Sequence, residues 1–496
     1  MPKRAWWVLL TLLILLSGEA SAAEWAEYKS ENFTLYSDVA EPAALEVLNN
    51  FEQFRFATLT FLGLPDTPES ERLLIVAYDR GRDYNKIRPS SNVTGFFYHS
   101  VFGPRMIIGA KGLTSDFQAT LFHEYVHYLM NHHSVNNFPR WYSEGFATLL
   151  SSARIDESSI VIGNAPPDYL RAISLDFEAS VDRIIDMEYD GTAYDFYLTS
   201  WLLTHYLLLD AENAPRRRES FLDYLSRYDT GEDPVDAFPE SFGITPSEMQ
   251  RELELYGRRH ALTVATLPRK PDTATVSRRV LSDGEDLYRL GDIAVERDVY
   301  SAAYEYFDAF EEEYGDSAFA EKVVSRRAIA YIHEGRVDEA DALIEPLLSL
   351  EIDDADILAD IAHYSYDRYL EAKDESSDAA DVYLTRSVNY GARAVELNGG
   401  DVEALFYLGS AYDAAGRLQL AADTFLKSYD INPMAPALNL ALIHIMLKGN
   451  QPEIASYLVS RLYSANHSEE GRARLLQLKE DIDSGNMDSE LIQQLL

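Results

Sequence analysis

The chain has 496 residues, no cysteine and a formal net charge of −39 at pH 7. The lack of cysteine excludes disulfides, thiolate metal ligands and a cysteine nucleophile, and a chain of this length can bury a large core without disulfides. A strongly acidic balance without a basic stripe argues against nucleic acid as a partner.

The first residues have the pattern of a secretory signal. Two cationic residues, Lys3 and Arg4, precede an apolar run over 5–16, and Ala-Ser-Ala follows at 20–22. This pattern predicts a signal peptide over residues 1–22, with an uncleaved membrane anchor as the alternative. Nothing later in the chain is apolar enough to predict a transmembrane span. We therefore expect an exported protein, and export without cysteines favours a bacterial periplasmic or secreted one.

The segment after the signal alternates between strand-like and helix-like patterns. Strands are predicted at 32–38, 72–78, 94–99 and 105–110, and a helix at 42–62. A further helix is predicted from about residue 114 to 131. We expect a small mixed sheet beside that helix.

The helix predicted from about residue 114 to 131 carries an H-E-x-x-H motif. Its histidines, His123 and His127, lie one turn apart on one face, so both imidazoles can reach the same metal ion. Glu124 lies near that face, where it can take a proton from a water molecule activated by the metal. The motif predicts one Zn²⁺ per chain, with Glu124 as the general base.

Two residues compete for the role of third metal ligand. His133 follows His127 at the spacing used by metzincins, but their pattern includes a glycine that this chain lacks. Glu144 follows His127 after sixteen residues, within the string W-x-x-E-G-x-A at 141–147. A turn near Pro139 would start a second helix and return Glu144 to the first. We predict Glu144 as the ligand.

The two motifs together resemble those of gluzincin zinc metallopeptidases, and the region from 24 to 259 is similar to bacterial peptidase MA-like domains. The resemblance implies an α+β domain, with a small mixed sheet beside the zinc helices, that hydrolyses amide bonds in a peptide or protein substrate. In that family an edge strand pairs with extended peptide. Here residues 93–110 supply either that strand or ordinary core strands. No G-x-M-E-N loop is present, which argues against exopeptidase action.

A long apolar helix is predicted at 193–209. Its Y-L-T-S-W segment, which begins at Tyr197, is similar to one that follows the zinc helices in these families. The resemblance implies that Tyr197 stabilises the oxyanion, although an aromatic that only packs in the core is the alternative. Tyr194 and His205 are alternative donors. Thr148 replaces an aspartate that orients a zinc histidine in thermolysin-like enzymes, so the partner of the histidines stays unidentified.

The rest of the chain differs in composition and pattern. Residues 260–280 are rich in Thr, Pro and Arg and predict an extended linker. Residues 281–496 are helical with a period near 34 residues, which resembles the tetratricopeptide repeat (TPR). The clearest unit has its marker residues at Leu405, Leu408, Gly409, Tyr412, Gly416, Ala421, Phe425 and Pro433. We predict an all-α TPR-like solenoid, a shape that usually presents a concave surface to a peptide or protein.

Three functions fit these patterns. The first is a zinc endopeptidase of the bacterial cell envelope whose repeats recruit a substrate or a protein partner. The second is a non-catalytic scaffold that binds through its repeats, although the presence of Glu124 argues against it because a scaffold needs no general base. The third is a metal-dependent amidase that acts on peptidoglycan peptides.

Overall fold

The structure is a computed structural model that describes residues 24–68, 72–91, 93–109, 115–133, 136–174, 179–186, 192–259, 261–271, 275–375, 378–466 and 468–485. The predicted signal peptide, residues 1–22, lies outside the described residues. Across the described ranges, no helix has both the length and the apolar character required to cross a bilayer.

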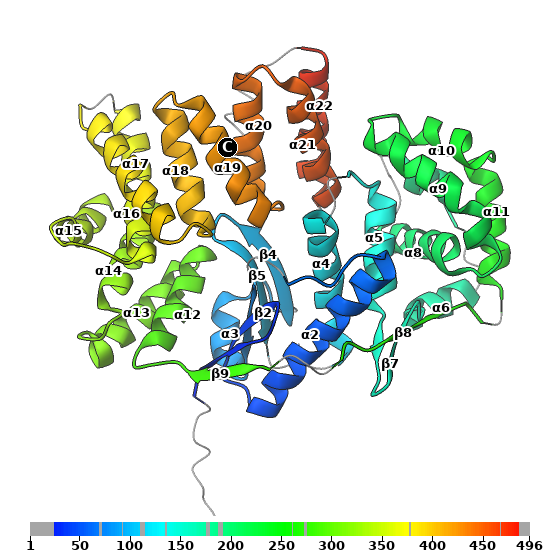
Figure 1. The fold of residues 1–496 in the computed structure, drawn as a ribbon, viewed down its shortest axis with the longest axis horizontal. Coiled ribbons are helices and arrows are strands. Elements are labelled where there is room, and N and C mark those ends of the chain that lie inside the picture. Colours follow the sequence, from blue (N-terminus) through cyan, green and yellow to red (C-terminus); the bar gives the residue numbers. More distant parts are fainter. Residues whose placement is uncertain are drawn as a thin grey trace, which may run out of the picture.

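A mixed six-stranded sheet lies at the centre of the first half of the chain (Figure 1). Its strands, in spatial order, are β4 (Gly95–Ser100), β5 (Gly103–Gly109), β3 (Leu73–Tyr78), β2 (Phe33–Ser37), β1 (Ala26–Lys29) and β9 (Ser277–Val280). β3 runs parallel to β2 and β5, whereas β4, β1 and β9 join by antiparallel pairing. The predicted small mixed sheet is therefore present, with β4 as one of its edge strands.

Aromatic packing attaches the helix that carries the H-E-x-x-H motif to this sheet. The helix, α4 (Ser115–His133), packs beside α2 (Glu41–Leu62). The Phe54 ring of α2 stacks on the Phe122 ring of α4 with 4.0 Å between centroids, and Phe33 of β2 contacts Tyr125 of α4. All four rings are buried, so their apolar surface holds α4 at a fixed place over the sheet.

Further helices continue from α4. The chain passes through α5 (Arg140–Ser151), α6 (Pro167–Ser174), α7 (Val181–Ile185), α8 (Ala193–Leu209), α9 (Asn213–Asp229), α10 (Pro234–Phe242) and α11 (Pro246–Gly257). Pro139 occupies the N-cap of α5, where a missing N–H costs nothing. The short helix α3 (Gly81–Ile87) lies between β3 and β4 in the chain.

The segment predicted to be a linker takes part in both sheets. β8 (Ala265–Pro268) pairs with β7 (Ser159–Ile162), which also pairs with β6 (Arg154–Ile155). β9 pairs with β1 in the main sheet. β8 and β9 are extended, as expected of this segment, but their strand pairing attaches them to the first domain.

The second half of the chain is an array of paired helices. They are α12 (Glu285–Glu296), α13 (Tyr300–Tyr314), α14 (Ala320–His333), α15 (Val337–Leu347), α16 (Ala355–Asp374), α17 (Ala380–Leu397), α18 (Val402–Ala414), α19 (Leu418–Ile431), α20 (Pro436–Lys448), α21 (Pro452–Ala465) and α22 (Glu469–Asp483). A Cβ at Gly291 would lie 2.2 Å from the Phe307 ring, and one at Gly409 would lie 2.7 Å from the Phe425 ring. Glycine at these repeat positions lets the two helices of a pair approach closely.

The array curves along the edge of the sheet and returns to α4 (Figure 1). Arg105 of β5 forms a salt bridge with Glu296 of α12 at 3.0 Å. Asn432, after α19, donates to the Ser100 carbonyl at 2.7 Å, and Arg461 of α21 donates to the Asn131 carbonyl at 2.9 Å. The end of the array is therefore held next to the H-E-x-x-H helix.

Candidate metal centre

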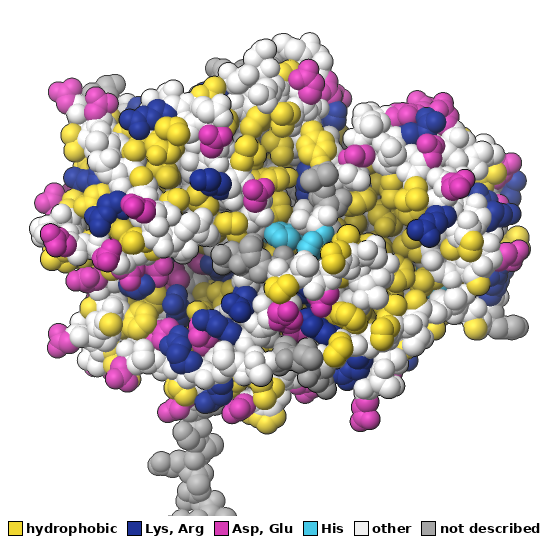
Figure 2. Space-filling view, viewed as in Figure 1, with side chains coloured by type: hydrophobic (Ala, Val, Ile, Leu, Met, Phe, Trp, Pro, Cys, Tyr) yellow, Lys and Arg dark blue, Asp and Glu magenta, His cyan; other side chains and the backbone are white. Residues whose placement is uncertain are grey.

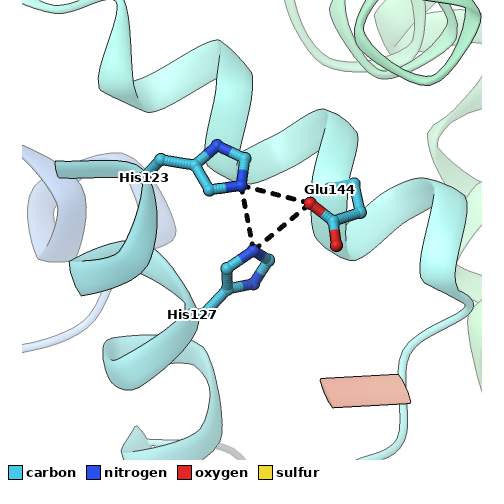
Figure 3. A group of neighbouring side chains, drawn as sticks. All are labelled: His123, His127 and Glu144. Atoms are coloured by element: carbon cyan, nitrogen blue, oxygen red, sulfur yellow. Dashed lines mark hydrogen bonds and ion pairs between the residues drawn. The ribbon is translucent and has the colours of Figure 1, made fainter. Parts of the chain in front are cut away.

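His123, His127 and Glu144 point toward one another from α4 and α5 (Figure 3). The two histidine Nε2 atoms are 3.1 Å apart, and Glu144 Oε2 lies 3.1 Å from His123 Nε2 and 3.4 Å from His127 Nε2. Donors of a tetrahedral zinc ion bound at about 2.0–2.1 Å lie about 3.4 Å from one another. Two imidazoles with one carboxylate are also a known ligand set for catalytic zinc, so these residues fit the ion.

Close packing of α8 against α5 explains the glycine that follows Glu144. A Cβ on Gly145 would lie 2.3 Å from the Ser200 carbonyl oxygen and 2.4 Å from Thr204 Oγ1, both on α8. Only a residue without a side chain lets the α8 backbone approach this closely. Tyr197 lies about one turn before Ser200, so the same contact sets the distance between Tyr197 and the three predicted ligands.

Tyr197 lies beside the predicted ligands. Its ring centroid is 6.4 Å from that of His123. Burial raises the pKa of Tyr197 to about 12, and the negative charges of Glu144 and Glu124 act in the same direction. The phenol therefore stays protonated at neutral pH and can donate a hydrogen bond.

The two alternative donors on α8 lie elsewhere. Tyr194 is 46% exposed, and its hydroxyl donates to the Asp168 carbonyl at 3.2 Å. His205 is buried, with the Tyr256 hydroxyl 2.6 Å from its Nδ1 and the Gly163 carbonyl 3.1 Å from its Nε2. Both polar groups of His205 are used within the core, which leaves Tyr197 as the tyrosine that faces the cluster.

His133, the alternative third ligand, is the last residue of α4. It belongs to neither of the groups of histidine and carboxylate donors that converge within 4.8 Å among the described residues. Its ring lies against that of His132, with centroids 5.3 Å apart. The structure thus brings Glu144, and not His133, to the two motif histidines.

Two hydroxyl groups that were not assigned a role from the sequence lie behind the histidine rings. Ser143 Oγ is 3.1 Å from His127 Nδ1, and Thr148 Oγ1 is 3.5 Å from His123 Nδ1, at the outer limit of a hydrogen bond. Hydrogen bonds of this kind orient an imidazole so that Nε2 faces a metal. Thr148, four residues after Glu144 on α5, is the residue noted from the sequence in place of an aspartate, without an assigned role, whereas Ser143 was not singled out.

Glu124 and His127 line a cleft of about 370 Å³ between the first domain and the array. β4 contributes Phe97, Tyr98 and His99 to one wall. The array contributes both apolar and polar residues, the apolar ones being Met434, Pro436, Leu440, Leu462 and Leu475 and the charged ones Arg461 and Arg474. Figure 2 shows histidine side chains near the centre of this face, below an area of hydrophobic side chains over the last helices of the array. The cleft is therefore formed by both halves of the chain.

No protein-family model and no curated protein matches the chain. Similar solved structures include TTC0263, a thermophilic TPR protein of Thermus thermophilus, which is 17% identical, with a TM-score of 0.34. That match covers 39% of this chain and 97% of TTC0263. MamA AMB-1 is 18% identical, with coverage of 40% and 98% and a TM-score of 0.26. These likenesses concern the fold and carry no information about a substrate.

Proposed function

We propose that this protein is a zinc-dependent endopeptidase of the bacterial cell envelope, of the gluzincin type, whose helical array receives a protein substrate or partner. One observation carries the proposal. His123, His127 and Glu144 converge with the spacing of tetrahedral ligands beside a cleft that also contains Glu124. When bound there, zinc acts as a Lewis acid and increases the acidity of water.

The side chains around the predicted ligands have separate roles in amide hydrolysis. Glu124 lines the cleft as a carboxylate, so it can take a proton from the attacking water and pass that proton to the leaving amine. Tyr197 donates a hydrogen bond to the substrate oxygen as negative charge develops on it. Ser143 and Thr148 orient the imidazoles of His127 and His123.

The walls of the cleft indicate the form of the substrate. β4 is an edge strand that lines the cleft, so an extended peptide can add to it through main-chain hydrogen bonds. The opposite wall, from α20 to α22, combines apolar side chains such as Leu440, Leu462 and Leu475 with Arg461 and Arg474, and its apolar part fits hydrophobic side chains of an unfolded segment. We therefore expect cleavage within extended, apolar regions of a protein chain.

A non-catalytic binding protein is the second candidate function. The observation that favours it is the extent of the helical array, which runs from Glu285 to Asp483 and itself lines the cleft. An amidase that acts on peptidoglycan peptides would use the same metal-site residues as the endopeptidase. Substrate assays on the purified chain separate these three functions.

The deciding experiment uses Glu124→Gln with Glu157→Gln as its control, because Glu157 is an exposed glutamate in a turn. Glu124→Gln should keep its zinc and lose hydrolysis of a denatured protein by about 100-fold or more. Glu157→Gln should behave as wild type. Full activity of Glu124→Gln would refute Glu124 as the base.

Metal analysis provides a second arm of this experiment. Glu144→Ala should lose the zinc ion held by the two motif histidines, whereas His133→Ala should keep that ion. The reverse result would identify His133, and not Glu144, as the third ligand. Wild-type protein that binds zinc but cleaves neither proteins nor peptidoglycan peptides would favour the binding protein.

A further inference from the structure

A second cluster of two histidines and a carboxylate lies within the helical array. His333 is the last residue of α14, and His363 and Asp367 are one turn apart on α16. These two helices pack against each other and belong to consecutive helix pairs. The proposed peptidase mechanism uses none of the three residues, so the cluster needs its own explanation.

The donor atoms of this cluster have nearly the same spacing as those of the first one. The two Nε2 atoms are 3.1 Å apart, and Asp367 Oδ2 lies 3.3 Å from His333 Nε2 and 3.4 Å from His363 Nε2. Tetrahedral zinc ligands lie about 3.4 Å apart. Two imidazoles and one carboxylate also suit zinc and the neighbouring divalent transition metals.

The partner of His363 Nδ1 determines which ring nitrogen faces the cluster with a lone pair. Nδ1 lies 2.9 Å from Glu403 Oε1, and both Glu403 oxygens accept from the two terminal nitrogens of Arg326 at 3.1 and 2.9 Å. A carboxylate held by a guanidinium can only accept, so Nδ1 of His363 carries the hydrogen. Nε2 faces the cluster and presents its lone pair when the ring is neutral. Burial lowers the pKa of His363, but Asp367 and Glu403 raise it to about 9 overall, so an ion binds there by displacing the Nε2 proton.

The same reasoning applies to His333. The Tyr300 hydroxyl donates to Asp298 at 2.7 Å, so its oxygen is free to accept from His333 Nδ1 at 3.1 Å. When both rings are neutral, Nε2 of His333 is likewise the nitrogen with the lone pair. The two Nε2 atoms and a carboxylate oxygen then converge on one point, as in ligand histidines whose outer nitrogens have hydrogen-bond partners.

The cluster is held rigidly on one side and is open on the other. His363 is fully buried, and its ring stacks on that of Tyr407 with 3.7 Å between centroids. The side chains of His333 and Asp367 are 27% and 21% exposed. An ion can therefore enter from solvent and take a water molecule as its fourth ligand.

We propose that His333, His363 and Asp367 bind one zinc ion that links helices of the array. The ion joins the helix pair of α14 to the pair of α16. Glu403, at the start of α18, extends this connection to the next pair through its hydrogen bond to His363. Arg326, which holds Glu403, lies 5.5 Å from the Phe102 ring centroid between β4 and β5, so the site stiffens the part of the array next to the edge strand.

Zinc content of the full-length protein tests this site. After exposure to zinc and gel filtration, wild type should hold about two ions per chain and His333→Gln about one. His444→Gln is the matched control, because His444 is a partly exposed array histidine 3.5 Å from Asp413 and outside the cluster. This control should hold as much zinc as wild type. Added zinc should raise the thermal midpoint of His123→Ala but not that of the double variant His123→Ala/His333→Gln.

The result with His123→Ala distinguishes this inference from the proposed function. His123→Ala should still hold about one zinc ion per chain, because the array site is intact. No zinc in His123→Ala, or equal zinc in His333→Gln and wild type, would overturn the inference. If zinc were lost in His333→Gln but unchanged in His123→Ala, the array site would stand and the proposed active site would fail. Asp367→Asn should lose the same amount of zinc as His333→Gln. A zinc content equal to that of wild type in Asp367→Asn would also overturn the inference about the array site.

Discussion

Replacement of Gly145 by alanine tests whether contact between α5 and α8 builds the candidate active site. The added Cβ would lie 2.3 Å from the Ser200 carbonyl oxygen, about 1 Å inside the ordinary contact distance of 3.4 Å. That oxygen belongs to the backbone of a buried helix, so it cannot turn aside as a flexible side chain would. The helices must separate by about 1 Å.

The cost of this separation follows from two opposing effects. Overpacking a core typically costs about 1–3 kcal/mol, whereas glycine to alanine within a helix gains up to about 1 kcal/mol. We expect a net loss of about 1–2 kcal/mol in the free energy of unfolding. Tyr197 moves away from Glu144 together with α8. The kcat of Gly145→Ala should therefore fall by a larger factor than the decrease in the folded fraction of the protein. A displacement of about 1 Å in a catalytic group can lower the rate about 100-fold.

Thermal unfolding, zinc content and peptidase rate of the folded protein measure these effects. Gly81→Ala is the control, because a Cβ at Gly81, at the start of α3, meets no atom within 4 Å. A Gly145→Ala protein with wild-type thermal midpoint and wild-type kcat would refute the role assigned to this contact. A lower thermal midpoint with unchanged kcat would mean that the contact between α5 and α8 stabilises the fold but does not position Tyr197.

Three more predictions follow from the site and its surroundings. Ser143→Ala removes the hydroxyl beside His127 Nδ1, so zinc affinity measured against a chelator should fall about 10- to 100-fold, and unchanged affinity would contradict the role of Ser143. Tyr197→Phe should lower kcat by a factor equivalent to about 3 kcal/mol with little change in KM, and a normal kcat would return Tyr197 to a packing role. Burial lowers the pKa of His205 from 6.5 to about 4, so the unfolded chain binds its proton first as the pH falls. The stability from neutral His205 is complete above pH 6.5 and declines between pH 6.5 and 4, by up to about 1.4 kcal/mol per pH unit. Over that pH range, the urea midpoint of His205→Gln should decline less than the urea midpoint of the wild type. An equal decline in the two proteins would contradict the lowered pKa of His205.

The position of the array affects how a substrate reaches the candidate active site. α20 to α22 form one wall of the cleft, and Arg461 ties α21 to the Asn131 carbonyl at the end of α4. Under the proposed function, the array would therefore line the path that a substrate takes to the candidate active site.

Local sequence patterns predicted most of the elements and the three candidate metal ligands that the structure brings together. The helix at 193–209 was predicted with the bounds that α8 has, and α4 ends two residues later than expected. Such elements depend on hydrophobic periodicity and on turn residues close in the chain, so the sequence alone indicates them. Glu144 was likewise indicated by its motif and by the turn at Pro139.

Contacts between distant residues could not be predicted in this way. The predicted linker forms β8 and β9 because free strand edges at β7 and β1, more than 100 residues away, accept its backbone hydrogen bonds. His333, His363 and Asp367 meet only because α14 packs on α16, and no short motif spans them. The sequence by itself determined which residues have metal-binding chemistry and which helices carry them. Tertiary packing alone decided that α8 brings Tyr197 to Glu144 and that the array forms one wall of the cleft, because both depend on surfaces that meet only in the folded chain.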